Sequence, residues 1–178
     1  MGTLSDYFVA SKTELKQVAD SGRVPETFPH VQSKGFDVVP IGQLSKLFGV
    51  DDEGVKPGDP VCNGDDFEWY VLQVTPALVK ALAVASDADV KKHGAAVAVI
   101  EELGWPTKHG REMVAALREL AQKAVATKKS MWRSALVDRG GGSRVRRERE
   151  GSVDRAGRGS LGRARTDGDG DGACHQRR

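Results

Sequence analysis

The basic residues of this 178-residue chain change type near residue 132. Residues 1–132 contain 12 Lys and 3 Arg, whereas residues 133–178 contain 12 Arg and no Lys. The first part has a net charge of −3 and the second a net charge of +5, which explains the small overall charge of +2. Hydrophobic periodicity also stops at this point. We therefore expect one globular domain in residues 1–132 and a disordered, basic, low-complexity tail in residues 133–178, because the apolar residues of the tail are too few to offset chain entropy.

Three short runs predict β-strands. Residues 7–10 are rich in aromatic and β-branched types, and Ser11 with Glu14 form the pattern that begins a helix behind them. Residues 36–39 form a second run, which is expected to stop at the next proline because that residue has no amide to donate. The run at 67–74 has apolar side chains on both faces, which predicts the central, covered strand of a sheet.

Three helices are expected in the second half of the predicted domain. They begin at Pro76, near Ser86 and at Pro106, where the residues are typical of helix starts. Gly94 lies in the middle helix, where glycine costs roughly 1 kcal/mol relative to alanine, so this is the position at which that helix is open to a break. We predict an α+β fold, with a small and mostly antiparallel sheet covered by three C-terminal helices.

The cysteines and the apolar runs bear on the compartment. Cys62 and Cys174 are far apart in the sequence, and the second lies in the predicted tail, which disfavours a structural disulfide. No apolar run approaches the ~20 residues that cross a bilayer, and residues 1–12 lack the pattern of a secretory signal. We expect a cytoplasmic protein without membrane contact.

No combination of residues indicates a catalytic, cofactor or metal site. None of the histidines lies at metal-ligand spacing from another ligand residue, and no glycine-rich phosphate loop occurs. The acidic run at 167–172 resembles a calcium-binding loop, but Arg178 replaces the glutamate that closes such a site. We therefore expect no catalytic residue, no cofactor and no metal.

Four residues are candidates for a ligand or partner surface. Trp69 lies in the best predicted strand, so packing in the core is the simpler role for it. Trp105 lies between two predicted helices, where an aromatic side chain either packs or lines a binding surface. His30 follows a proline in an extended stretch, and Cys62 lies in an acidic loop at residues 51–66. With the carboxylates of that loop, either His30 or Cys62 would support a small enzyme.

The arginines of the tail suggest contact with nucleic acid. Arg144, Arg146, Arg147 and Arg149 lie close together, and arginine-rich segments bind phosphates. Against specific recognition, no Phe or Tyr is interleaved for base stacking, and seven acidic residues share the tail. We expect weak, nonspecific nucleic-acid contact through the tail.

Three stretches resemble a family of small uncharacterised proteins that are common in actinobacteria. They are residues 4–10, 74–79 and 101–106, the last of which precedes a Leu/Ala-rich helix. The resemblance covers roughly the predicted domain and implies no activity, so no site residue follows from it. Members tend to end in a short aromatic strand, which begins here at 130–132. We hypothesise that the residues from about 133 are an out-of-frame translation of GC-rich DNA, which would remove the last strand from the domain.

The sequence favours a small cytoplasmic protein of a high-GC bacterium with a non-catalytic binding or interaction role. A nucleic-acid-associated protein that uses the basic tail is the first alternative. A small enzyme that uses the acidic loop is the second. A protein partner would suit the favoured role, but the sequence identifies neither partner nor ligand.

Overall fold

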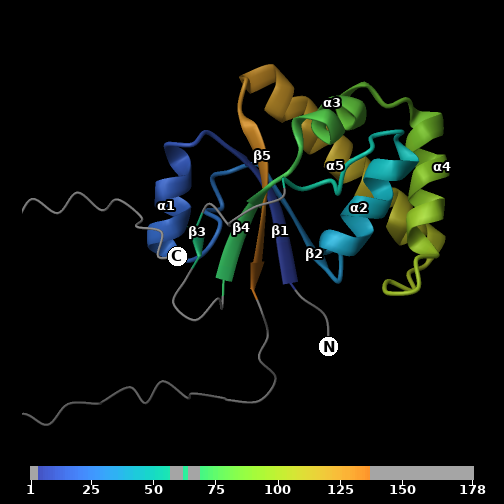
Figure 1. The fold of residues 1–178 in the computed structure, drawn as a ribbon, viewed down its shortest axis with the longest axis horizontal. Helices are drawn as coiled ribbons and strands as arrows, with labels where there is room; N and C mark the ends of the chain where they lie inside the picture. Colours follow the sequence, from blue (N-terminus) through green and yellow to red (C-terminus); the bar gives the residue numbers. More distant parts are fainter. Residues whose placement is uncertain (1–3, 57–61, 64–68, 137–178) are drawn as a thin grey trace, which may run out of the picture. The chain divides into compact units, whose positions relative to one another are not determined.

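The computed structural model describes residues 4–56, 62–63 and 69–136. These residues form five strands and five helices, which confirms the predicted α+β class (Figure 1). The strands are β1 (Leu4–Ala10), β2 (His30–Lys34), β3 (Cys62–Asn63), β4 (Trp69–Gln73) and β5 (Ser130–Leu136). The helices are α1 (Glu14–Ser21), α2 (Val38–Leu47), α3 (Pro76–Val84), α4 (Asp87–Ala98) and α5 (Thr107–Thr127).

The strands form one antiparallel sheet in the order β2-β1-β5-β4-β3. The antiparallel pairing is as predicted, but the middle position belongs to β5 and not to the run at 67–74. That run contains β4, which has a strand on each side of it. Apolar side chains on both faces identify such an inner strand, but they do not tell which inner strand is the middle one.

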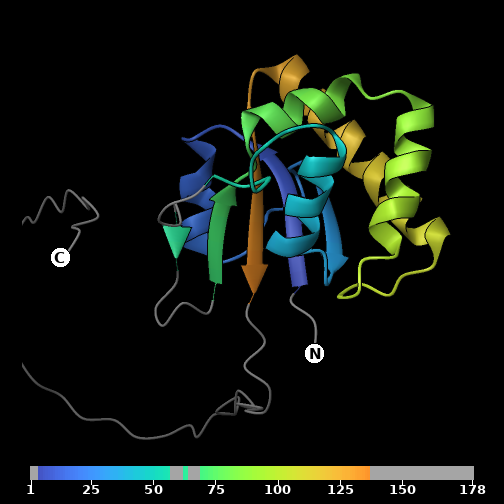
Figure 2. The same ribbon diagram turned by 45° about the vertical axis from the view of Figure 1, so that its right-hand side comes forward.

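Alternating side chains divide the buried residues between the two faces of the sheet. On β1, Tyr7 and Val9 face a large core that α2 to α5 complete, whereas Phe8 and Ala10 face a smaller core under α1. Helix α5 contacts β1, β2 and β5, and α4 packs against α5 and α2. Figure 2 shows α1 on its own side of the sheet, apart from the other four helices.

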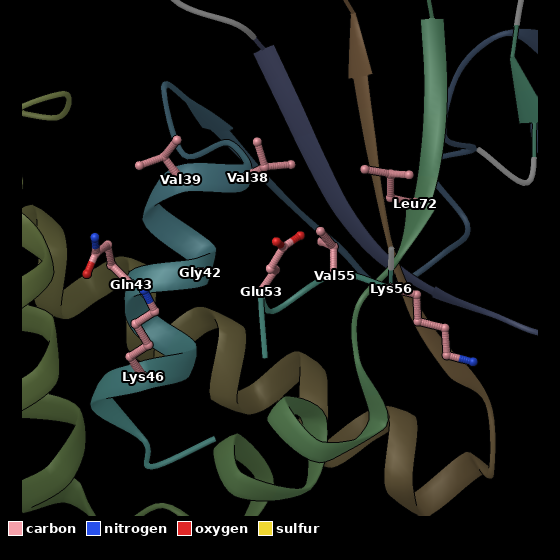
Figure 3. A pocket seen from close by; sticks show the side chains of 9 residues that line it. All are labelled: Val38, Val39, Gly42, Gln43, Lys46, Glu53, Val55, Lys56 and Leu72. Carbon is pink, nitrogen blue, oxygen red and sulfur yellow. The ribbon is translucent and has the colours of Figure 1, made fainter. Parts of the chain in front are cut away.

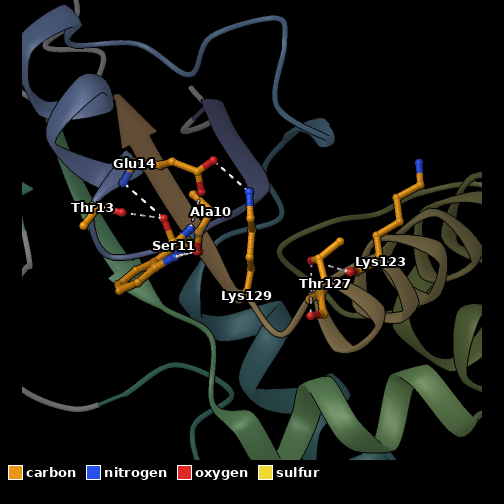
Figure 4. A network of polar contacts seen from close by, with 9 residues as sticks. Ala10, Ser11, Thr13, Glu14, Lys123, Thr127 and Lys129 are labelled. Atoms are coloured by element: carbon orange, nitrogen blue, oxygen red, sulfur yellow. Dashed lines mark hydrogen bonds and ion pairs between the residues drawn. The ribbon is translucent and has the colours of Figure 1, made fainter.

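The helix start predicted after β1 is present as a reciprocal pair of hydrogen bonds (Figure 4). The Ser11 N–H donates to Glu14 Oε2 at 2.7 Å, and the Glu14 N–H donates to Ser11 Oγ at 3.2 Å. The Lys129 ammonium donates to the other carboxylate oxygen at 2.7 Å. Lys129 first, and then Ser11, lower the pKa of Glu14 to about 2. This carboxylate therefore holds α1 against the turn between α5 and β5.

The starts of α3 and α4 also follow the prediction. The Leu78 N–H donates to Thr75 Oγ1 at 3.4 Å at the start of α3. At the start of α4, the Asp89 N–H donates to Ser86 Oγ at 3.2 Å and the Asp89 carboxylate accepts the Ser86 N–H at 3.1 Å. Local side-chain chemistry determines where these helices begin.

The strand predicted at residues 36–39 is wrong, because α2 begins there. The Asp37 carboxylate accepts the Val39 N–H at 3.1 Å and caps the helix. Pro40 lies in the first turn, where an amide has no partner inside the helix and its absence costs nothing. The strand of this region is β2, which the sequence indicates only as extended chain.

Gly94 does not break its helix, since α4 is continuous from Asp87 to Ala98. Gly94 lies where α4 crosses α5 at Gly110, and a Cβ atom at Gly94 would lie 2.5 Å from the Arg111 Cα atom. The two glycines therefore allow the helix backbones to approach closely, which a larger residue at either position would prevent.

The domain boundary predicted at residue 132 is wrong, because β5 continues through Leu136. The residues from Arg133 to Leu136 pair with both β1 and β4. The predicted loss of the last strand is therefore wrong as well, since this strand is the middle of the sheet. The predicted disorder of the tail and its out-of-frame origin concern residues after 136, which lie outside the described residues.

Among the described helices, none combines the length and the apolar character that crossing a membrane requires. The cytoplasmic location stays a prediction.

Candidate functional site

His30 and Cys62 lie on opposite edges of the sheet. His30 begins β2 and Cys62 begins β3, and the other three strands lie between them. Four strand spacings of about 4.8 Å separate the two edge strands by roughly 19 Å. His30 and Cys62 therefore do not share a site, and the pairing of either one with the acidic loop stays a prediction, because residues 57–61 and 64–66 of that loop lie outside the described residues.

The described part of the acidic loop, residues 51–56, contributes to the fold. The Asp52 carboxylate accepts hydrogen bonds from Ser45 Oγ at 2.7 Å and from the Gly54 N–H at 2.8 Å. Burial of Asp52 opposes its ionisation, but these hydrogen bonds outweigh burial and keep the pKa of Asp52 below its ordinary value. Asp52 thus fixes the loop to α2 as a carboxylate and is not available as an acid.

Glu53, the next residue, lines a hollow of about 560 Å³ between α2 and β4 (Figure 3). The hollow has apolar walls, which include Val38 and Leu72, and it also contains Lys46 and Lys56. Its described lining has no histidine, cysteine or hydroxyl side chain that would pair with Glu53 in acid–base chemistry. Nor do the described residues include a group of three or more His, Cys, Asp or Glu placed to hold a metal ion.

The two tryptophans proposed for a binding surface differ in exposure. Trp69 is 8% exposed and packs in the core under α1, as the strand pattern predicts. Trp105 is half-buried, with its ring centroid 5.9 Å from that of Phe36 and 4.3 Å from that of His109. Trp105 therefore packs on the core with part of its surface and leaves the rest for a neighbouring groove.

This groove, named the β2–α5 groove below, has a volume of about 590 Å³ and lies between β2 and the first half of α5. Trp105 and Leu103 lie at its end near Gly35, where Leu103 is 3.6 Å from the position of a Cβ atom on that glycine. Glu102 and Glu112 line its helical side. The remaining lining residues are Val31, Gln32, Ser33, Lys34, His109, Met113 and Ala116.

The outer edge of β2 borders this groove and has no partner strand among the described residues. The Val9 N–H donates to the Pro29 carbonyl at 3.1 Å, so the residues of β2 that bond to β1 are those at even spacing from Pro29. The backbone groups of Val31 and Ser33 therefore point toward β1. Those of Gln32 and Lys34 point outward, where they are open to another strand.

Ser33 is a buried polar residue on the groove side of β2. It is 6% exposed, and its Oγ atom has no hydrogen-bond partner. Ser33 lies directly opposite Ser5 of β1, on the face of the sheet that α5 covers. A buried hydroxyl without a partner costs about 1–3 kcal/mol, so its retention needs an explanation.

Ser5 belongs to a row of polar side chains that crosses the sheet from Ser33 to Tyr70. Arg133 of β5 is fully buried, and its guanidinium donates to Ser5 Oγ at 3.0 Å and to the Tyr70 hydroxyl at 3.2 Å. The guanidinium carbon also lies 5.5 Å from the centroid of the Tyr70 ring. No acidic residue of the described part forms an ion pair with Arg133. The hydrogen-bonded row therefore runs from Tyr70 through the positively charged Arg133 to Ser5, and Ser33 lies opposite Ser5 without a hydrogen bond to it.

Sequence reasoning missed both Arg133 and Ser33. Composition assigns Arg133 to the tail, and no alternation of polar and apolar residues at 130–136 marks the strand that contains it. Ser33 gives no signal either, because a serine in an extended stretch is usually exposed. Arg144, Arg146, Arg147 and Arg149, the proposed nucleic-acid contacts, lie outside the described residues.

The described groove and strand edge offer open backbone groups, an aromatic wall and a hydroxyl, all of which are groups that can bind a ligand. Comparison of the chain with models of protein families, with curated proteins and with solved structures finds no match. The resemblance to small actinobacterial proteins accordingly stays a prediction.

Proposed function

We propose that this protein is a non-catalytic binding domain that takes up an extended segment of a partner protein along β2. The observation that carries the proposal is the open backbone edge at Gln32 and Lys34 directly beside the β2–α5 groove. A segment in strand conformation would satisfy these backbone groups and direct alternate side chains into the groove. Affinity would come from the backbone pairing and specificity from the groove.

The groove walls suit one class of segment. Trp105, Leu103 and Met113 provide apolar and aromatic contact area, whereas Glu102 and Glu112 place negative charge on the helical side. Glu112 is 3.8 Å from Lys108 in a largely exposed pair, which neutralises little of its charge. An extended segment with apolar residues and at least one basic residue therefore matches the groove better than an acidic segment does.

The nucleic-acid alternative depends on arginines outside the described residues and stays a prediction. It predicts a different salt dependence, because binding through a basic tail would weaken steeply as the salt concentration rises. Strand addition depends on backbone hydrogen bonds and apolar contact and would be far less sensitive to salt.

The test is selection of binding peptides from a phage-displayed library of random linear sequences on the full chain. Selected peptides are then measured against Gln32→Pro, which removes an outward N–H from the edge but leaves the pairing of β2 with β1, and against Ala116→Arg, which fills the groove. We expect each change to weaken binding by about tenfold or more. Val84→Ala, which alters an exposed apolar residue on α3, is the matched control and should have no effect.

Thermal unfolding of each variant shows whether it folds as the parent chain does. N-methylation of the peptide at successive positions adds an independent readout, because strand addition predicts sensitivity at alternate positions. The proposal fails if no peptide is selected, or if the selected peptides bind Gln32→Pro and Ala116→Arg as tightly as the parent chain.

A further inference from the structure

The proposed function leaves open which side chains the partner segment carries, and the pairing geometry of β2 restricts them. The sheet is antiparallel throughout its described strands, so an added strand is taken as antiparallel. Residues opposite Gln32 and Lys34 would then exchange backbone hydrogen bonds with β2. The residue opposite Ser33 falls in a non-hydrogen-bonded pair, in which Cα atoms are about 4.5 Å apart and side chains are closest.

The residue opposite Ser33 points to the same face as Ser33, which is the face that lines the groove. At this separation its side chain lies within reach of the Ser33 hydroxyl, the buried polar atom without a partner. The segment residue two positions away lies opposite Val31, where Met113 and Ala116 form the α5 wall. The two segment residues therefore meet different surroundings, one polar and one apolar.

The Ser33 hydroxyl is free both to donate and to accept a hydrogen bond. The Arg133 guanidinium has no acceptor atom, so Ser5 Oγ accepts from it at 3.0 Å. Ser33 lies directly opposite Ser5, but no hydrogen bond joins the two hydroxyls. A side chain that carries a hydrogen-bonding group and comes within reach of Ser33 would therefore satisfy it.

The pairing distance and the groove restrict the size and charge of this group. Because Cα atoms in a non-hydrogen-bonded pair are only about 4.5 Å apart, a short side chain is enough to reach the Ser33 hydroxyl. Glu102 and Glu112 disfavour a further carboxylate nearby. We infer that the partner segment places a small, uncharged hydrogen-bonding side chain, Ser, Thr or Asn, opposite Ser33 and an apolar side chain opposite Val31.

This inference rests on the proposed function, and a double-mutant cycle tests it separately. The probe is the tightest peptide from the phage selection, made as a series that carries Thr or its isostere Val at one position at a time. Each peptide is measured against the full chain with Ser33, with Ser33→Ala and with Ser33→Thr. Ser134→Ala, which removes a buried serine from the opposite face of the sheet, is the matched control.

We expect one peptide position at which Thr binds about threefold to tenfold more tightly than Val. Ser33→Ala should abolish that difference, Ser33→Thr should keep most of it, and Ser134→Ala should leave it unchanged. If no position couples to Ser33 while the peptide still loses binding to Gln32→Pro, the inference is overturned and the proposed function stands. If no selected peptide loses binding to Gln32→Pro, the inference and the proposed function are both overturned.

Discussion

Ser5 and Ser33 are identical residues directly opposite each other in the sheet, yet only Ser5 has a side-chain hydrogen-bond partner. Ser5 lies on β1, which has a strand on each side, and Arg133 of β5 reaches it from the interior. Ser33 lies on β2, which has a described neighbour on one side only. Ser5 is thus satisfied by a side chain of the adjacent inner strand. Ser33 has no described strand on its outer side, so a strand added there would bring a partner within its reach.

From the comparison of Ser5 with Ser33, we expect the largest loss of stability when Arg133 is replaced. Arg133→Ala should lower the free energy of unfolding by about 2–5 kcal/mol, because it leaves a cavity and removes the donors to Ser5 and Tyr70. Urea unfolding followed by circular dichroism at neutral pH measures this difference. Arg23→Ala, at an exposed arginine, should change stability by less than about 0.5 kcal/mol.

Arg133→Met separates the two causes, since it keeps most of the side-chain volume but none of the hydrogen bonds. It should cost less than Arg133→Ala, because apolar residues of similar volume replace buried charges well. A loss below about 1 kcal/mol for Arg133→Ala would show that Arg133 is not the centre of a polar row.

The sequence predicts those parts of the fold that local chemistry determines. The helix starts at Ser11, Thr75 and Ser86 depend on side chains within three residues of each other, so they are readable without tertiary information. Gly94 and residues 36–39 mislead because a nearby helix or a capping aspartate decides their structure. Secondary-structure propensity describes a residue in an isolated chain, and tertiary packing overrides it in the fold.

The candidate site is predictable only in part, for the same reason. Trp105 stands out in the sequence as an aromatic residue between two helices, and the structure places it in the groove. Ser33 becomes distinctive only once β2 is known to be an edge strand. Composition hides Arg133, because the number of arginines in a long segment does not show that one of them is buried on a strand.

The second-largest effect should occur at Ser5. Ser5→Ala leaves a buried guanidinium donor without its acceptor, and hydrogen bonds to charged groups contribute about 1.5–3 kcal/mol. Tyr70→Phe removes the other acceptor of Arg133 but at a half-buried position, so its cost should be smaller. Urea unfolding of both variants, and of the double variant, measures how far the two contacts depend on each other. Equal costs for Ser5→Ala and Ser33→Ala would contradict the comparison.

His93 of α4 provides a titratable counterpart to Ser33. It is 8% exposed, its Nδ1 atom has no hydrogen-bond partner, and its ring centroid is 4.5 Å from that of Phe48. Burial first, and then Lys92, lower the pKa of His93 below its ordinary 6.5, while Asp89 opposes the shift. A lowered pKa means that the unfolded chain binds the proton more readily.

The stability that neutral His93 provides is therefore complete above pH 6.5 and declines as the pH falls through 6.5 toward the lowered value. The free energy of unfolding should drop more between pH 8 and pH 5.5 in the parent chain than in His93→Phe. His30 and His109 are exposed and present in both proteins, so they cancel in this difference. Parallel pH profiles would show that His93 is protonated as easily in the fold as in the unfolded chain.

The smallest effect, and the most discriminating, should occur at Ser33. Ser33→Ala removes a buried hydroxyl that has no partner, so the free energy of unfolding should stay unchanged or rise by up to about 1 kcal/mol. Urea unfolding of Ser33→Ala and of Ser5→Ala compares the changes in the free energy of unfolding at two serines that lie opposite each other on neighbouring strands. A loss of more than 1 kcal/mol for Ser33→Ala would mean that the hydroxyl is already satisfied within the chain, and no ligand would be needed to explain it. An unchanged or higher stability would instead show that the Ser33 hydroxyl is unsatisfied in the free protein, which is the condition under which a partner side chain gains most by bonding to it.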